Sequence, residues 1–133
     1  MPDLRKKLGD FGEQAAAVYL IRQGYELLAR KWRNHTRERA GGGGEIDLVV
    51  RDGMALVFVE VRTRRHPGGG LGSAEESVGP LKQARLIALA YAYLEVAAVP
   101  ADTPWRIDVI ALDVDRAGRI AELRHIRDAV EET

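Results

Sequence analysis

The sequence contains no cysteine among its 133 residues. Disulfide bonds, zinc–thiolate sites and thiol catalysis are therefore excluded. The absence also fits a chain that works in a reducing cytoplasm, which is the location we expect. The sequence has no signal peptide and no apolar run long enough to span a membrane, so we expect no membrane partner.

An excess of charge of one sign is also missing, because 20 Lys and Arg residues balance 20 Asp and Glu residues. The overall charge therefore gives no indication of a polyanionic partner. The local distribution does, since two basic clusters border the central part of the chain. The first cluster comprises Arg30, Lys31, Arg33, Arg37 and Arg39, and the second comprises Arg62, Arg64, Arg65 and His66. Together they predict a basic rim around the residues between them.

The hydrophobic pattern predicts a single domain over residues 1–133. Helices are expected over residues 4–23 and from Pro80 to about residue 97. Strands are expected over residues 25–32, 44–50, 55–62, 105–112 and 119–126. The resulting order α-β-β-β-α-β-β favours the α/β class, with a mixed β-sheet core flanked by helices.

Two stripes of residues recur at helical spacing in the first predicted helix. The larger side chains are Leu8, Phe11, Ala15, Val18 and Tyr19. The second stripe is made of small residues and contains one acid, Glu13. No basic residue lies three or four positions from Glu13, so no partner along the helix is available to it. Glu13 is either an ordinary exposed helical residue or a functional carboxylate.

The two central strands carry acids in the middle of apolar runs. Asp47 lies between Ile46 and Leu48, and Glu60 lies between Val59 and Val61. A tight turn at Asp52-Gly53 would join the strands as a hairpin.

With a two-residue turn there, Asp47 lies opposite Phe58 and diagonal to Glu60 on the same face. Two carboxylates converging in this way can hold one hard divalent cation. With a three-residue loop, Asp47 would lie on the opposite face.

Isolated acids are also common on solvated strand faces, and spacing alone does not exclude that interpretation. The mid-strand positions of Asp47 and Glu60, together with Glu13 on the preceding helix, favour a site. We expect Trp32 and Trp105 to lie in the core, and we expect Arg106 and Asp108 to form a structural pair.

The arrangement of Glu13, Asp47 and Glu60-x-Arg62 resembles the PD-(D/E)-x-K nuclease superfamily, in the form found in archaeal Holliday-junction resolvases. Over nearly its whole length the chain is also similar to the YraN family of uncharacterised bacterial proteins. The matching stretches include Gly43-Gly44-Glu45-Ile46-Asp47-Leu48, Val57-Phe58-Val59-Glu60-Val61-Arg62 and Lys82-Gln83. The resemblance implies a restriction-endonuclease-like fold.

The resemblance also implies a metal site. Asp47, Glu60 and Glu13 would hold one or two Mg²⁺ or Mn²⁺ ions, and no organic cofactor is expected. The superfamily usually has lysine where this chain has Arg62, and arginine cannot act as a general base because it stays protonated. Lys82 is the candidate for the missing lysine, if the first turn of the second helix faces the hairpin. The expected nucleic-acid contacts are Arg33, Arg37, Arg39, Arg64, Arg65 and Gln83.

Three functions remain open from the sequence. The first is a metal-dependent endonuclease for branched or otherwise structured DNA. By analogy with resolvases, which cut two symmetric strands, this endonuclease would be a homodimer. The second is a non-catalytic nucleic-acid-binding module that keeps the nuclease fold. The third is a protein-interaction domain that uses the apolar second helix.

Overall fold

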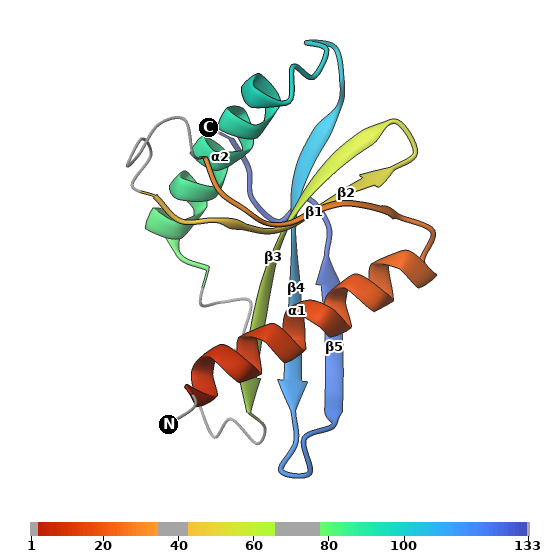
Figure 1. Cartoon of the computed structure of the whole chain (residues 1–133), viewed down its shortest axis with the longest axis vertical. Coiled ribbons are helices and arrows are strands. Elements are labelled where there is room, and N and C mark those ends of the chain that lie inside the picture. The colour runs from red at the N-terminus through yellow and green to blue at the C-terminus, as the bar shows by residue number, and fades with distance from the viewer. Residues whose placement is uncertain (1–2, 35–42, 66–77, 133) are drawn as a thin grey trace.

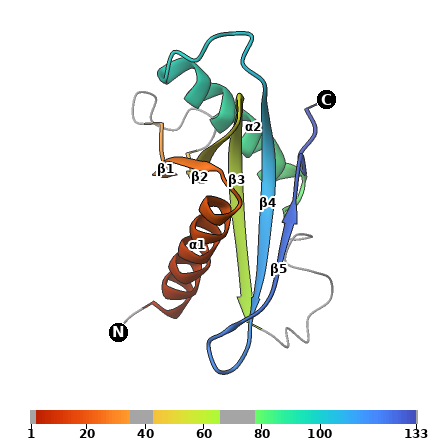
Figure 2. The same ribbon diagram turned by 90° about the vertical axis from the view of Figure 1, so that its right-hand side faces the viewer.

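Five strands form one mixed sheet in the computed structural model, with a helix packed on each face (Figures 1 and 2). The structure describes residues 3–34, 43–65 and 78–132. The elements are α1 (Leu4–Arg22), β1 (Glu26–Trp32), β2 (Ile46–Asp52), β3 (Ala55–Arg65), α2 (Pro80–Val96), β4 (Trp105–Val114) and β5 (Ile120–Ile126). The predicted order and the predicted fold class are both confirmed.

The strands are arranged across the sheet in chain order, from β1 to β5. β3 and β4 run parallel, with α2 in the connection between them, and the other three pairings are antiparallel. β3 pairs with β4 along its length from Leu56 to Arg65, but it pairs with β2 only as far as Val59. The last six residues of β3 therefore extend past β2. This step in the sheet is where the candidate site lies.

The hairpin between β2 and β3 turns at a different place from the one predicted. Asp52 pairs with Ala55, so the loop is Gly53-Met54, and Val49 rather than Asp47 lies opposite Phe58. Gly53 has a φ of +61°, which suits glycine at the first position of a type II′ turn.

Asp52 stays in the ladder, where its carboxylate lies 3.2 Å from Arg106 Nη2. The loop still has two residues, so the face of each side chain is preserved. Continued by one step, the observed register puts Asp47 directly opposite Glu60 instead of diagonal to it.

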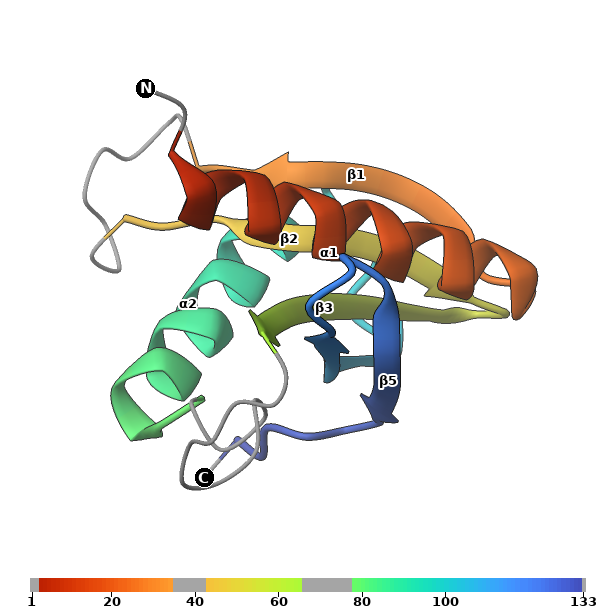
Figure 3. The ribbon, with the colours of Figure 1, turned by 90° about the horizontal axis from the view of Figure 1, so that it is seen from below.

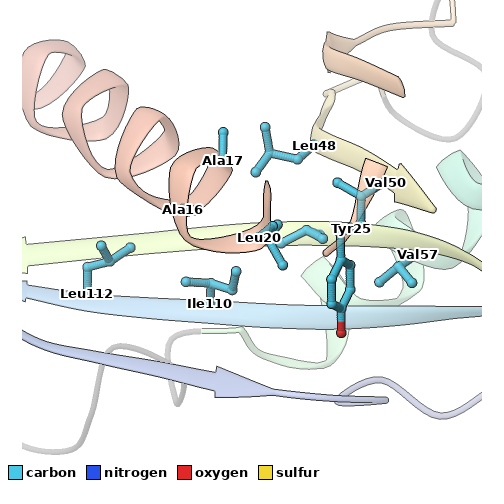
Figure 4. Close-up of a cluster of buried hydrophobic side chains, with 10 residues drawn as sticks. Ala16, Ala17, Leu20, Tyr25, Leu48, Val50, Val57, Ile110 and Leu112 are labelled. Carbon is cyan, nitrogen blue, oxygen red and sulfur yellow. The ribbon is translucent and has the colours of Figure 1, made fainter. Parts of the chain in front are cut away.

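Helix α1 packs on the sheet through its stripe of small residues. Ala16, Ala17 and Leu20 are buried against strands β2, β3 and β4 (Figure 4). The stripe of larger residues is the more exposed one, since Phe11 is 43% exposed and Val18 is 36% exposed. The small side chains let the helix come close to the sheet, and this also carries Glu13 into the interior.

Helix α2 covers the other face of the sheet. Pro80 occupies its first turn, as predicted, and Leu86, Leu89 and Ala90 are buried. The aromatic rings beneath it pack edge to face, with Trp32 on Tyr93 and Trp105 on both Phe58 and Tyr91. The two tryptophans therefore belong to the core, as the sequence predicted. Neither helix in the described part of the chain is long and apolar enough to cross a membrane.

Candidate functional site

Asp47 lies at the point where β2 stops pairing with β3. The last paired residues are Leu48 and Val59, and beyond them the Val61 N–H donates to Asp47 Oδ2 at 2.8 Å. The side chain of Asp47 thus replaces a backbone acceptor on the edge of β3. This contact holds the carboxylate of one strand against the backbone of its neighbour.

The environment of Asp47 makes its negative charge unfavourable. Partial burial, followed by the neighbouring charge of Glu60, raises the pKa of Asp47 from 3.8 to about 7, although the Val61 N–H and the charge of Lys82 oppose the shift. Two carboxylates in one partly desolvated place are a common source of such a shift. A perturbed acid of this kind is a functional-site candidate when the geometry also supports one.

Glu60 is almost fully buried and is approached by two cations. Its Oε2 lies 3.2 Å from Arg62 Nε and 3.7 Å from Lys82 Nζ. Its other oxygen, Oε1, is buried without a hydrogen-bond partner, and so is Arg62 Nε, which is close enough for an ion pair but is not aligned for a hydrogen bond. The first turn of α2 therefore does face the hairpin, as the role predicted for Lys82 required.

Glu13 is also buried, with 4% of its surface exposed, and its cations come from β1. Because α1 runs alongside β1 (Figure 3), Lys31 Nζ lies 3.1 Å from Glu13 Oε2 and Arg30 Nε lies 3.8 Å from Oε1. Burial raises the pKa of Glu13, with Lys31 opposing the shift and the charge of Asp47 adding to it. Glu13 is thus not an exposed helical residue, and it lies within electrostatic range of Asp47.

Lys31 is a site residue that the sequence analysis missed. Its backbone has a φ of +49°, a conformation uncommon for residues other than glycine, and its side chain also donates to Asp10 Oδ1 at 3.0 Å. Lys31 appeared only as one member of a basic cluster. Its pairing with Glu13 depends on how α1 crosses β1, which no local spacing reveals.

A close contact between α1 and β3 sets the depth of Glu13. A Cβ atom at Gly12 would come within 1.8 Å of Thr63 Oγ1, so only glycine fits here without movement. Gly12 therefore lets the helix approach the end of β3 that extends past β2. The next residue along the chain, Glu13, is brought to the same end of the strand.

The donor set at this end of β3 consists of carboxylates, the ligands preferred by Mg²⁺ and Mn²⁺. One oxygen of Glu13 and one of Glu60 are buried and accept no hydrogen bond, and such acceptors are of the kind that a cation would satisfy. No group of three or more acidic or histidine side chains within the described ranges is gathered closely enough to hold a metal. The fit therefore rests on Asp47 and Glu60, and Glu13 as a further ligand stays a prediction.

The predicted nucleic-acid contacts are only partly brought near the site. Arg33 pairs with Glu45 at 2.8 Å, and Arg64 pairs with Asp113 at 3.2 Å. The Gln83 side chain donates to the Val78 carbonyl at 2.9 Å at the start of α2. Arg65 is exposed at the end of β3, while Arg37 and Arg39 lie outside the described residues.

A second polar cluster is structural. Arg106 Nε lies 3.0 Å from Asp108 Oδ1, as predicted, and His125 Nε2 lies 2.8 Å from the other Asp108 oxygen. Burial would raise the pKa of Asp108, but hydrogen bonds from His125, from the Asp128 N–H and from Arg106 lower it overall. Asp108 is thus a fully partnered buried acid, in contrast to Glu60.

Comparison with known proteins places the chain among bacterial relatives of similar length. It is 50% identical over 132 residues to a UPF0102 protein of Roseiflexus castenholzii and equally identical to one of Chloroflexus aurantiacus, with 99% of each chain covered. A UPF0102 protein of Pelotomaculum thermopropionicum is 45% identical over 129 residues, covering 97% of this chain and 99% of the relative. Residues 12–112, which include Glu13, Asp47 and Glu60, match the uncharacterised protein family UPF0102. The similarity to the YraN family is thereby confirmed, and the chain belongs to this family, UPF0102.

Proposed function

We propose that this protein is a divalent-metal-dependent endonuclease that acts on branched or otherwise structured DNA. The observation that carries the proposal is the meeting of Asp47 and Glu60 where β3 extends past β2. One carboxylate has a pKa raised to about 7, and the other keeps a buried oxygen without a partner. Both features suit a site that is completed by a cation.

Each residue has a role in this proposal that follows from its surroundings. Asp47 and Glu60 would hold Mg²⁺ or Mn²⁺, which when bound supplies a more acidic water and polarises the phosphodiester. The Val61 N–H fixes the orientation of Asp47. Arg62 and Lys82, both within 4 Å of Glu60, are placed to bind a phosphate oxygen and to stabilise charge that develops on it.

A second candidate function is a nucleic-acid-binding module without catalysis, acting like the first in the cytoplasm. The observation that favours it is Arg62, which stays protonated and cannot act as a base. The lysine nearest to Glu60 is Lys82, which lies on α2 and not on β3, with its Nζ 3.7 Å from Glu60 Oε2. The two candidates share the same binding surface and differ in whether the phosphodiester is cut.

A cleavage assay distinguishes the two candidates. The protein is incubated with a DNA four-way junction, and separately with a linear duplex of the same sequence, in Mg²⁺ or Mn²⁺. We expect metal-dependent cleavage of the junction, reduced at least about 100-fold in Asp47→Asn and in Glu60→Gln. Asp102→Asn, a change of the same kind on an exposed loop residue, is expected to cleave like the wild type.

Binding of the junction without cleavage in either metal would favour the non-catalytic module. Equal cleavage by the wild type and by both acid variants would contradict the assignment of the site. In that case a contaminating nuclease, or another part of the chain, would be responsible for the cleavage.

A further inference from the structure

Glu60 is held by two cations that come from different elements and reach it from the solvent side. Arg62 is two residues further along β3, and Lys82 lies on α2. Their side chains are 32% and 28% exposed, whereas that of Glu60 is 4% exposed. Both cations are therefore partly exposed to solvent, whereas the carboxylate between them is not.

The contacts that these cations make with Glu60 are electrostatic rather than well-formed hydrogen bonds. Lys82 Nζ lies 3.7 Å away, and Arg62 Nε has no hydrogen-bond partner although it is buried. Lys31 is different, because it donates to Glu13 at 3.1 Å and to Asp10 at 3.0 Å. The cations on Glu60 are thus less firmly held than the lysine on Glu13.

While Arg62 and Lys82 are paired with Glu60, a divalent ion must compete with them for this carboxylate. A cation added beside Arg62 and Lys82 meets their positive charge, which weakens its binding. Equally, a phosphate that draws Arg62 and Lys82 away leaves a buried carboxylate without compensation, which is costly. Each ligand alone therefore binds under a penalty that the other removes.

We propose that DNA and the divalent metal ion bind to this site cooperatively, because the phosphate backbone takes over Arg62 and Lys82 while the metal takes over Glu60. The inference rests on the proposed function, since it needs a metal at Asp47 and Glu60. It adds that the metal affinity of the free protein is low. It also makes Lys82 and Arg62 the residues that couple the two ligands.

The experiment measures the dissociation constant of Mn²⁺ with and without DNA. Free Mn²⁺ is followed by electron paramagnetic resonance in the presence of the full chain, alone or with a four-way junction whose crossover linkages are phosphorothioates that resist cleavage. We expect the junction to tighten Mn²⁺ binding at least about five-fold in the wild type. By linkage, Mn²⁺ should tighten junction binding by the same factor.

Three variants test whether Lys82 couples the two ligands. Lys82→Met should bind Mn²⁺ more tightly than the wild type without DNA, and the effect of the junction should shrink toward one-fold. Lys6→Met removes the same charge from an exposed position, where the side chain pairs with Asp10, and it should keep the wild-type coupling. Lys82→Arg, which keeps the charge, should also keep most of the coupling.

Three results overturn the inference. If Mn²⁺ binds wild type with one affinity whether or not the junction is present, the ligands are independent, although the metal site of the proposed function would stand. If Lys82→Met couples them as strongly as wild type does, Lys82 is not the link. If wild type binds no Mn²⁺ in either condition, the proposed function fails, and this inference fails with it.

Discussion

Asp47 combines a structural contact with an unfavourable charge. Its carboxylate accepts the Val61 N–H, yet partial burial and the charge of Glu60 raise its pKa to about 7. Natural proteins often tolerate such a cost where function requires it. At the scale of single residues, Asp47 is therefore where stability and the proposed activity oppose each other.

The raised pKa of Asp47 predicts how stability depends on pH without metal. The folded chain holds this proton more tightly than the unfolded chain, whose pKa is near 3.8, so the resulting stability is present at low pH and is lost as pH rises toward 7. Between pH 5 and pH 8, Asp47 should cost the wild type on the order of 2 kcal/mol. In urea unfolding, Asp47→Asn should lack this loss while keeping an acceptor for the Val61 N–H.

The measure is the difference in free energy of unfolding between Asp47→Asn and wild type at each pH. This difference should grow in favour of the variant as pH increases. Asp102→Asn serves as the exposed control and should follow the wild type. A constant difference across the range would show that Asp47 titrates near its ordinary value.

Gly12 predicts a sharp contrast between two glycines of the same helix. Gly12→Ala should destabilise the fold by about 1–3 kcal/mol, because the new Cβ would overlap Thr63 Oγ1. Gly9→Ala meets nothing within 4 Å and should stabilise it by about 0.5–1 kcal/mol. Thermal unfolding of both variants checks the prediction. Adding Thr63→Ala to Gly12→Ala should restore part of the lost stability. Equal effects of the two substitutions would contradict the close approach of α1 to β3.

At the scale of elements, α1 is an unusual helix because two alanines, Ala16 and Ala17, face the core beside Leu20, whereas Phe11 and Val18 are exposed. Leu20 is fully buried, whereas Val18, on the outer stripe, is 36% exposed. Leu20→Ala should therefore cost about 2–5 kcal/mol, whereas Val18→Ala should cost less than about 1 kcal/mol. Chemical denaturation of the two variants tests this orientation of the helix. A larger loss in Val18→Ala would mean that the outer stripe is the one that packs.

The elements themselves could be predicted from the sequence because their signals are local. Pro80 marks the start of α2, and alternating or continuous apolar runs mark the strands. The face of α1 could not be predicted in this way, because hydrophobicity favours Phe11 and Val18 while the close packing of the helix favours alanine and glycine. The sequence predicts the turn at Asp52-Gly53, one residue earlier than the observed Gly53-Met54, because Asp-Gly is a strong turn signal. The pairing of Asp52 with Arg106, which keeps Asp52 in the strand, is not visible in the sequence.

In the candidate site, too, some contacts could be predicted from the sequence and others could not. Asp47 and Glu60 share a hairpin, so alternation along two strands is enough to bring them together in prediction. Lys31 could not be found, because its contact with Glu13 joins a helix and a strand whose crossing is set by the packing of α1. The metal and DNA contacts of these residues stay predictions.

At the scale of the whole molecule, the formal net charge is zero, so net charge gives no long-range attraction to a polyanion, and the proposed DNA binding must rely on the local arrangement of charges. Within the described ranges, four cations lie within 4 Å of Glu13 or Glu60: Arg30, Lys31, Arg62 and Lys82. These cations come from β1, β3 and α2. Of the three acids, Glu13 lies on α1, Asp47 on β2 and Glu60 on β3. The fold thus brings several separate elements to one end of β3.

If Asp47 and Glu60 form the proposed divalent-metal site, Mn²⁺ bound to the protein must lie beside these two residues. Paramagnetic broadening of backbone amide signals by Mn²⁺ should be recorded for the full chain bound to the phosphorothioate four-way junction. We expect the strongest broadening at the amides of Asp47, Glu60 and Val61, and we expect this broadening to be lost in Asp47→Asn. Broadening centred elsewhere, or the same broadening at these amides in Asp47→Asn, would contradict it.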